Sequence, residues 1–185
     1  MQQIIEKFSD EIVLKAKKIK AIVTDVDGIL TDGGIIYDGG TGEWKHFNVK
    51  DGQIIKPLRE NGIVVAAITG RNSAVVKRRL NELKFDYHVH GKLAKLKYFE
   101  EVLATFSLKA SEVCYLGDDL TDMACLQAAG LGICPADAIS YVKEKADYIT
   151  TTAGGEGVFR EAADLILAAQ GKLDKIVAQY LSQDI

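Results

Sequence analysis

Two carboxylates, two residues apart, directly follow a short apolar run near the N-terminus. Residues 21–23 are Ala-Ile-Val, which favours a buried strand, and Asp25 and Asp27 stand where such a strand would end. Ligand sites in open α/β sheets lie at the carboxyl ends of strands, so this position suits functional carboxylates. Because Gly28 comes next, a plain strand end with an Asp-Gly turn is the alternative interpretation.

Three further polar clusters follow later strand-like segments or begin a helix. They are Thr69, Gly70 and Arg71 after one strand, Asp118 and Asp119 after another, and Lys95 at the start of a helix. The carboxyl ends of parallel strands share one edge of a sheet, so these clusters can converge. Neighbouring carboxylates repel one another unless a cation holds them ionised, and Mg²⁺ binds carboxylates and phosphate oxygens together. We therefore expect Mg²⁺ on Asp25 and Asp118.

The segments between these clusters alternate between strand and helix patterns. We expect strands at residues 21–23, 62–68, 86–89, 112–116, 131–134 and 148–150, and helices at residues 4–16, 50–58, 73–83, 93–106, 123–128, 158–169 and 173–181. Asp51 is the expected N-cap of the second helix. This alternation predicts an α/β fold with a doubly wound, mostly parallel sheet.

One segment breaks the alternation. Residues 33–49 carry two β-prone arms around a glycine-rich turn, which predicts an inserted β-hairpin. Exposed aromatic side chains on its arms would need cover, from a partner subunit or over an active site. A hairpin packed on its own domain is the alternative. The chain has no repeats and no linker, so we expect one domain over residues 1–185 with a helical tail at about residues 157–185.

Composition narrows the class of protein. The chain has 185 residues and a formal net charge of −3, which argues against nucleic acid as a partner. Cys114, Cys125 and Cys134 are odd in number and lie in apolar surroundings, so we expect reduced core residues and not a disulfide or zinc set. No apolar run reaches the roughly 18 residues of a membrane span, and no signal-peptide core is present. We expect a cytoplasmic protein.

The motifs carry a family resemblance. Residues 25–33, Asp-Val-Asp-Gly-Ile-Leu-Thr-Asp-Gly, resemble the first motif of the haloacid-dehalogenase-like phosphatases. Within that superfamily the chain is most similar to the capless 3-deoxy-D-manno-octulosonate 8-phosphate (KDO 8-phosphate) phosphatases. Residues 47–52 and 154–160 resemble that family's post-hairpin segment and the glycine-rich start of its tail. The gaps after the first two motifs hold only a hairpin and a helix with a strand, so no cap domain is expected.

The resemblance implies an activity and an assembly. It implies a Rossmann-like, Mg²⁺-dependent phosphatase that releases phosphate from KDO 8-phosphate during lipopolysaccharide sugar synthesis. It also implies a homotetramer in which the hairpins meet and the C-terminal tail closes an adjacent site.

The resemblance further implies roles for individual residues. Asp25 would be the nucleophile that forms an aspartyl-phosphate, and Asp27 would protonate the leaving alkoxide and then activate water. The backbone carbonyl of Asp27 would join Asp25 and Asp118 as a Mg²⁺ ligand. Thr69, Gly70, Arg71 and Lys95 would bind the substrate, Thr69 and Lys95 at the transferring phosphoryl group, and Asp119 and Asp122 would orient the waters of the metal.

Several of these residues have plainer interpretations. Thr69 can be a strand cap, Lys95 a surface lysine and Asp122 a charge at a helix start. Arg71 suits a sugar carboxylate, since a guanidinium fork fits such a group, but an ion pair with a nearby Asp is the alternative. His90 stands where glutamine is more usual in the octulosonate family.

Two other functions compete with the octulosonate phosphatase. A sister family acts on a nonulosonate (KDN) 9-phosphate and typically carries Glu after the Thr-Gly of the second motif and a lysine further along the helix. This chain has Arg71 and Glu82 there. The fold also occurs as a non-catalytic, tetramerising module of nucleotide-sugar synthetases. Such a module is expected to lose the catalytic carboxylates, whereas Asp25, Asp27 and Asp118 are all present.

Overall fold

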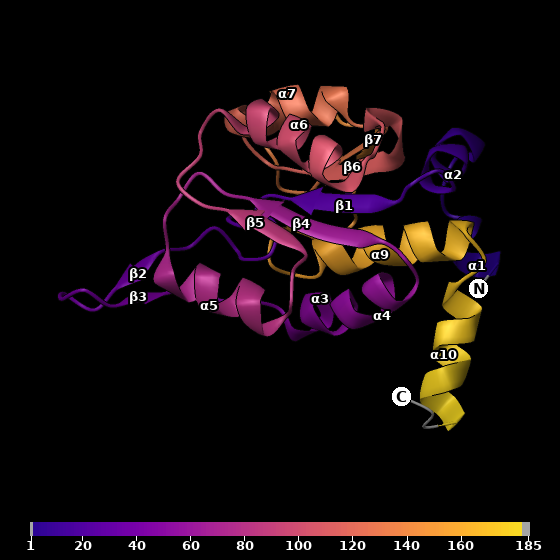
Figure 1. Cartoon of the computed structure of the whole chain (residues 1–185), viewed down its shortest axis with the longest axis horizontal. Helices are drawn as coiled ribbons and strands as arrows, with labels where there is room; N and C mark the ends of the chain where they lie inside the picture. Colours follow the sequence, from indigo (N-terminus) through magenta and orange to yellow (C-terminus); the bar gives the residue numbers. More distant parts are fainter. Residues whose placement is uncertain (1, 183–185) are drawn as a thin grey trace.

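The computed structural model describes residues 2–182 and is built around a six-stranded sheet. All neighbouring strands are parallel, in the order β5-β4-β1-β6-β7-β8 (Figure 1). The strands are β1 (Ala21–Thr24), β4 (Val64–Ile68), β5 (Tyr87–Val89), β6 (Val113–Leu116), β7 (Leu131–Cys134) and β8 (Tyr148–Ile149). The predicted doubly wound, parallel α/β sheet is confirmed, with every predicted strand present.

Helices cover both faces of this sheet (Figure 1). One face packs on α6 (Lys95–Phe106), α7 (Met123–Ala128) and the short α8 (Ser140–Lys143), which the sequence pattern did not predict. The other face packs on α2 (Asp10–Ala16), α4 (Ile55–Glu60), α5 (Ala74–Glu82) and α9 (Val158–Ala169). α3 (Val49–Gln53) and α10 (Leu173–Ser182) pack against α9. Alternate residues of β1 enter the two cores, Val23 on the first side and Ile22 on the second. This two-sided burial explains why the strands are continuous apolar runs.

The order of the strands places a crevice beside β1. From β1 the chain builds β4 and β5 on one side, then crosses to build β6, β7 and β8 on the other. β1 and β6 are therefore hydrogen-bonded neighbours at the point where the strand order reverses, which is where ligands bind in open α/β sheets. The backbone N–H of Asp25 donates to the carbonyl of Leu116 at 2.9 Å, so this pairing continues one residue into the crevice.

The predicted hairpin is present but short. Its arms are β2 (Ile36–Tyr37) and β3 (Glu43–Trp44), and it projects beyond the sheet on the side of α5 (Figure 1). Ile36 and Trp44 face each other across the hairpin and are both 66% exposed, so this side of the hairpin is not covered by the described part of the chain. Of the two predicted alternatives, the structure favours a hairpin whose outer side chains lack cover within the chain.

The prediction of one continuous helix over residues 4–16 is wrong. The chain forms α1 (Gln2–Ile5) and α2, with Ser9 between them as the N-cap of α2. The Ser9 hydroxyl accepts the N–H of Ile12 at 3.4 Å. Serine offers the backbone this local hydrogen bond in place of a continuing helix, so the apolar periodicity runs across a break.

The helix predicted for residues 50–58 is likewise two helices, α3 and α4, and Asp51 is not its N-cap. Asn48 caps α3, because its side-chain oxygen accepts the N–H of Lys50 at 2.9 Å. Asp51 is buried inside α3, and its Oδ1 accepts the N–H of Arg160 at 2.8 Å. Arg160 lies in the first turn of α9, whose own N-cap residue, Gly157, has no side chain. Asp51 therefore caps a different helix from the one predicted.

The glycine-rich segment before α9 supports the loop that follows β1. The N–H of Gly155 donates to the carbonyl of Ile29 at 3.0 Å. A Cβ on Gly154 would lie 2.3 Å from the carbonyl oxygen of Gly28, so a larger residue would push the two loops apart. The start of the predicted tail thus packs beside the first motif of its own chain. Residues 183–185 of that tail lie outside the described residues.

Two further expectations concern the core and the membrane. Cys114, Cys125 and Cys134 are buried and unpaired, which confirms their interpretation as core residues. Within residues 2–182, every helix is too short or too polar to cross a bilayer.

Replacing Asp51 should destabilise the fold through α9. We expect Asp51→Ala to lower the free energy of unfolding by about 1 kcal/mol, the typical cost of losing an N-terminal cap. Asp51→Asn should keep most of that stability, since its amide oxygen can still accept the N–H of Arg160. Urea unfolding of the three proteins measures the difference, and equal stability of the Ala and Asn variants would contradict the capping role.

The difference in stability between wild type and Asp51→Asn also depends on pH, and the sign of this dependence can be derived. Burial raises the pKa of Asp51 from its ordinary 3.8 to about 6, and this outweighs the capping hydrogen bond. Between these values the native state binds more protons than the unfolded state, so stability rises as the pH falls. Wild type should therefore gain about 1 kcal/mol relative to Asp51→Asn between about pH 7 and pH 5. A constant difference would show that Asp51 ionises normally.

Candidate active site

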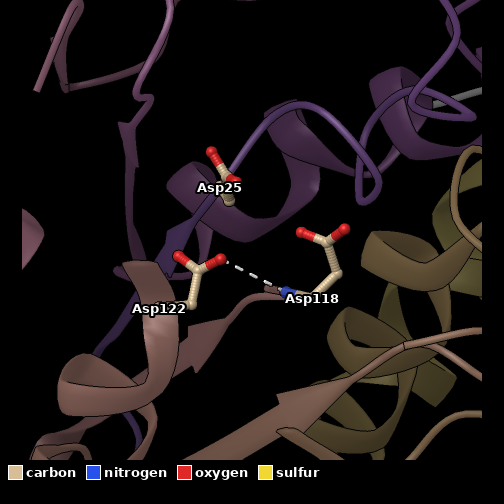
Figure 2. Close-up of side chains that lie close together, drawn as sticks. All are labelled: Asp25, Asp118 and Asp122. Atoms are coloured by element: carbon tan, nitrogen blue, oxygen red, sulfur yellow. Dashed lines mark hydrogen bonds between the residues drawn. The ribbon is translucent and has the colours of Figure 1, made fainter. Parts of the chain in front are cut away.

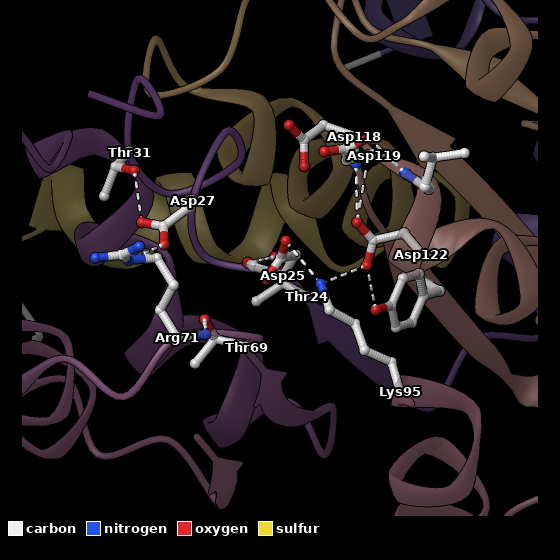
Figure 3. Close-up of polar contacts among 12 residues, drawn as sticks. Thr24, Asp25, Asp27, Thr31, Thr69, Arg71, Lys95, Asp118, Asp119 and Asp122 are labelled. Atoms are coloured by element: carbon white, nitrogen blue, oxygen red, sulfur yellow. Dashed lines mark hydrogen bonds and ion pairs between the residues drawn. The ribbon is translucent and has the colours of Figure 1, made fainter. Parts of the chain in front are cut away.

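The side chains that follow β1, β4 and β6 line one pocket at the carboxyl edge of the sheet. Its lining residues are Asp25, Asp27, Gly28, Gly33, Thr69, Gly70, Arg71, Lys95, Asp118, Asp119 and Thr121. The pocket thus brings together every predicted site residue except Asp122, which is buried behind it. Figure 3 shows the polar contacts that join these side chains.

Three carboxylates form the centre of the site (Figure 2). One oxygen each of Asp25, Asp118 and Asp122 lies within 4.8 Å of the others, a spacing that suits a metal ion. Within residues 2–182, the Oδ1 atoms of Asp25 and Asp118 are buried and have no hydrogen-bond partner. Oxygen donors without partners are what a hard cation such as Mg²⁺ requires, so the residues present fit the predicted ion.

A glycine makes room for this arrangement. Gly28 has a φ of +83°, and a Cβ at this position would lie 2.1 Å from Oδ2 of Asp118. Any larger residue would be strained and would displace that carboxylate. The glycine after Asp27, which the sequence also allowed as a plain turn, therefore shapes the metal-binding side of the pocket.

Lys95 neutralises part of the carboxylate charge. It lies in the first turn of α6 and is only 2% exposed, so it is not a surface lysine. Its ammonium is 2.7 Å from Oδ2 of Asp25 and 2.7 Å from Oδ1 of Asp122 (Figure 3). Burial alone would lower the pKa of Lys95, but attraction to both carboxylates outweighs it and the pKa is raised.

The carboxylates remain under-compensated even with Lys95 present. Burial, reinforced by repulsion from Asp122, raises the pKa of Asp25 to about 8 although Lys95 opposes the shift. Burial and the same neighbour raise the pKa of Asp118 to about 7. Both acids are therefore held more weakly ionised than ordinary aspartates, and a bound cation would reverse that shift.

Asp122 is the hub that joins the site to the core. Its Oδ1 accepts hydrogen bonds from Lys95 and from the hydroxyl of Tyr115, at 2.7 and 2.6 Å. Its Oδ2 accepts the backbone N–H groups of Asp118 and Asp119, at 3.3 and 3.4 Å. Because both oxygens are already engaged, Asp122 is a weaker candidate for direct metal binding than Asp25 or Asp118.

Asp119 is exposed, and its side chain caps a short helix and does not join the carboxylate cluster. Its Oδ1 accepts the N–H of Leu120 at 2.7 Å, which caps the short helix η2 (Leu120–Asp122). The side chain lines the pocket without joining the three clustered carboxylates.

The second motif combines structural and site contacts. Thr69 is buried, and its hydroxyl accepts the N–H of Arg71 at 3.3 Å, as a strand cap would. Arg71 reaches toward the hairpin, where it donates to the Tyr37 hydroxyl at 2.9 Å and lies 3.6 Å from Glu43. Its Nε is 3.9 Å from Asp27. Arg71 therefore forms the ion pair that the sequence left open, while still lining the pocket.

Two residues at the site were missed by sequence reasoning. Lys45 follows β3, and its buried ammonium contacts Oδ1 of Asp27 at 2.5 Å. A lysine in a glycine-rich hairpin looks solvent-exposed, so its type gave no signal. Tyr115 stands in the apolar run of β6, where a core role was the natural interpretation. Its spacing of seven residues from Asp122 is the only signal, visible once the strand and the turn are placed.

Metal binding should compete with protons at this site. Because Asp25 and Asp118 have pKa values of about 8 and 7 without metal, Mg²⁺ must displace protons near neutral pH. We expect Mg²⁺ to raise the melting temperature more at about pH 8 than at about pH 6, and to release protons in calorimetry with two buffers. Asp118→Asn should weaken both effects. If Mg²⁺ raised the melting temperature equally at both pH values, the assignment of Asp25 and Asp118 as metal ligands would be contradicted.

Comparisons with known proteins agree with this geometry. A model of the haloacid dehalogenase-like hydrolase family matches residues 88–161. The chain is 41% identical to the 3-deoxy-D-manno-octulosonate 8-phosphate phosphatase KdsC of Escherichia coli (strain K12). The alignment spans 174 residues, which are 94% of this chain and 92% of the relative.

Solved structures give the same result. The 3-deoxy-D-manno-octulosonate 8-phosphate phosphatase of Moraxella catarrhalis, in complex with magnesium, phosphate and KDO, is 40% identical with a TM-score of 0.91, over 94% of this chain and 99% of that chain. The cobalt-bound enzyme of Haemophilus influenzae is 40% identical with a TM-score of 0.83, over 85% and 92%. The chain belongs to the haloacid dehalogenase-like superfamily and, within it, to the 3-deoxy-D-manno-octulosonate 8-phosphate phosphatase family.

Proposed function

We propose that this protein is a Mg²⁺-dependent phosphomonoesterase that hydrolyses KDO 8-phosphate to KDO and phosphate. The observation that carries the proposal is the state of Asp25 at the end of β1. Lys95 holds one of its oxygens at 2.7 Å, and the other is buried at the pocket with no partner in the described part of the chain. An oriented carboxylate with one free oxygen, beside a metal-binding cluster, suits a nucleophile that attacks phosphorus. Family membership identifies the reaction class.

The residues divide the chemistry between them. Asp25 attacks through Oδ1 to form an aspartyl-phosphate, while Lys95 fixes Oδ2 and balances negative charge. Asp27 gives a proton to the leaving sugar oxygen and later takes one from the attacking water. Thr69 and Gly70 line the position of the transferring phosphoryl group.

The metal site is assigned to a small set of oxygens. Asp25, Asp118 and the backbone carbonyl of Asp27 would hold Mg²⁺, with Asp119 and Asp122 orienting its waters. When bound, the ion neutralises phosphate charge and keeps the carboxylates ionised. The Oδ1 atom of Asp118, which is buried and has no hydrogen-bond partner among the described residues, supports this assignment.

The substrate and the assembly rest mainly on the family. Arg71 at the pocket rim would bind the sugar carboxylate and would give up its contacts with the hairpin to do so. A KDN 9-phosphate remains the second candidate substrate, and a non-catalytic tetramerising module is the alternative of another class. We further propose one phosphatase domain over residues 1–185, a cytoplasmic location, and a homotetramer with the hairpin and the C-terminal tail at subunit interfaces.

Removing the nucleophile should stop turnover. We expect Asp25→Asn to lower kcat by about 10³-fold or more and to abolish acid-stable labelling by ³²P-labelled substrate. The variant should stay folded, since Lys95 keeps its contact with Asp122. Asp32→Asn is the matched control, because Asp32 is exposed on the same loop and its contacts, with the N–H of Gly34 and with His46, lie outside the pocket lining. Substantial activity in Asp25→Asn would remove Asp25 as the nucleophile.

Substrate preference separates the competing functions. We expect Mg²⁺-dependent phosphate release to favour KDO 8-phosphate over a KDN 9-phosphate and over hexose phosphates, with the preference reduced in Arg71→Ala. A stronger response to the nine-carbon substrate would keep the mechanism and transfer the chain to the sister function. Absence of release from all of them would leave the non-catalytic module.

A further inference from the structure

The hairpin places one buried cation against Asp27, a residue of the pocket. The side chain of Lys45 is 0% exposed, although the neighbouring Trp44 is 66% exposed. Its ammonium lies 2.5 Å from Oδ1 of Asp27 and 3.7 Å from Glu43. Burying an ammonium is costly unless a close anion compensates it, so the Asp27 contact is what holds Lys45 in this position.

The two oxygens of Asp27 have different surroundings. Oδ1 receives the ammonium of Lys45 and, at 3.4 Å, the hydroxyl of Thr31. Oδ2 is buried and has no hydrogen bond among the described residues, and Nε of Arg71 lies 3.9 Å from it. A carboxylate anchored through one oxygen cannot rotate freely, so its other oxygen has a fixed direction. Asp27 lines the same pocket as Asp25.

We propose that Lys45 is a positioning residue that anchors Oδ1 of Asp27 so that Oδ2 performs the proton transfers of the reaction. The proposal rests on the phosphatase function proposed above. In the first step, Oδ1 of Asp25 bonds to phosphorus as the P–O bond to the sugar breaks, the electron pair of that bond goes to the sugar oxygen, and the proton on Oδ2 of Asp27 moves to that oxygen. In the second, Oδ2 takes a proton from the water whose oxygen attacks phosphorus, and Asp25 is released as a carboxylate.

This role gives the hairpin a function within its own subunit. Lys45 reaches Asp27 from beyond β3, and Arg71 binds Tyr37 of the other arm at 2.9 Å. The hairpin is therefore tied to the acid–base residue through Lys45 and to the second motif through Arg71. A purely structural role of Lys45 would involve the same contacts. The test must therefore distinguish a loss of stability from a loss of proton transfer.

Leaving-group chemistry provides that separation. A sugar alkoxide is a poor leaving group and needs the proton from Asp27, whereas p-nitrophenolate leaves without one. For Lys45→Met we expect kcat/KM for KDO 8-phosphate to fall roughly 10²-fold, the scale of lost general acid catalysis. The burst of p-nitrophenol from p-nitrophenyl phosphate, which reports the first step alone, should change less than about 3-fold.

Three variants complete the experiment. Lys45→Arg should restore part of the activity on KDO 8-phosphate, because it keeps a cationic donor for Oδ1. Lys45→Gln retains a neutral donor and tests the role if the Met variant unfolds. Lys50→Met is the matched control, since Lys50 is exposed on α3 and lies outside the pocket lining, and both substrates should be unaffected.

The outcomes are distinguishable. Equal losses on both substrates would overturn the proposal and make Lys45 a phosphate-binding or structural residue. Unchanged activity on KDO 8-phosphate would overturn it as well. If wild type released phosphate from neither substrate, the proposed function itself would fail, which differs from a selective effect of Lys45.

Discussion

The structure of the site depends on one buried ammonium between two carboxylates. Lys95 lies 2.7 Å from both Asp25 and Asp122, and these three side chains come from α6, the end of β1 and η2. Removing one partner of such a buried pair typically costs on the order of 3–5 kcal/mol, because an uncompensated charge remains. The same contact orients the proposed nucleophile, since it occupies one oxygen of Asp25 and leaves the other without a partner. Local stability and reactivity therefore come from the same interaction.

The sheet explains why this charge cluster is tolerated. Both faces of β1 and β6 are covered, and the pocket at their carboxyl edge gives the carboxylates an opening toward solvent. Tyr115 connects the two environments, with its ring packed in the core and its hydroxyl on Asp122. The raised pKa values of Asp25 and Asp118 show that this edge still carries an electrostatic cost. A site with such a cost gains most from binding a cation, which is why the donor set and the topology point to the same chemistry.

Sequence reasoning succeeded where burial and local pattern decide the structure. The strands were predictable because two-sided burial makes them continuous apolar runs, and the polar clusters stood out where those runs end. Sequence reasoning failed where a residue distant in the sequence determines what a side chain contacts. Asp51 looked like the cap of its own helix, whereas its carboxylate caps α9 across the fold. Lys45 looked exposed by residue type, but its partner Asp27 lies 18 residues earlier. Neither contact leaves a periodicity that a single sequence can show.

The hairpin combines two roles by strand alternation. Glu43 and Lys45 flank Trp44, so their side chains point to the opposite side of the arm from the indole ring. That inward side carries charge and reaches Asp27 and Arg71, while the outward side carries the exposed aromatic ring. This reverses the usual arrangement, in which the apolar side of a hairpin packs on its own domain. The inward charges contact Asp27 and Arg71, which line the pocket, while the outward side leaves the indole ring exposed. A short insertion can thus bring charged groups to the pocket residues without adding a second core.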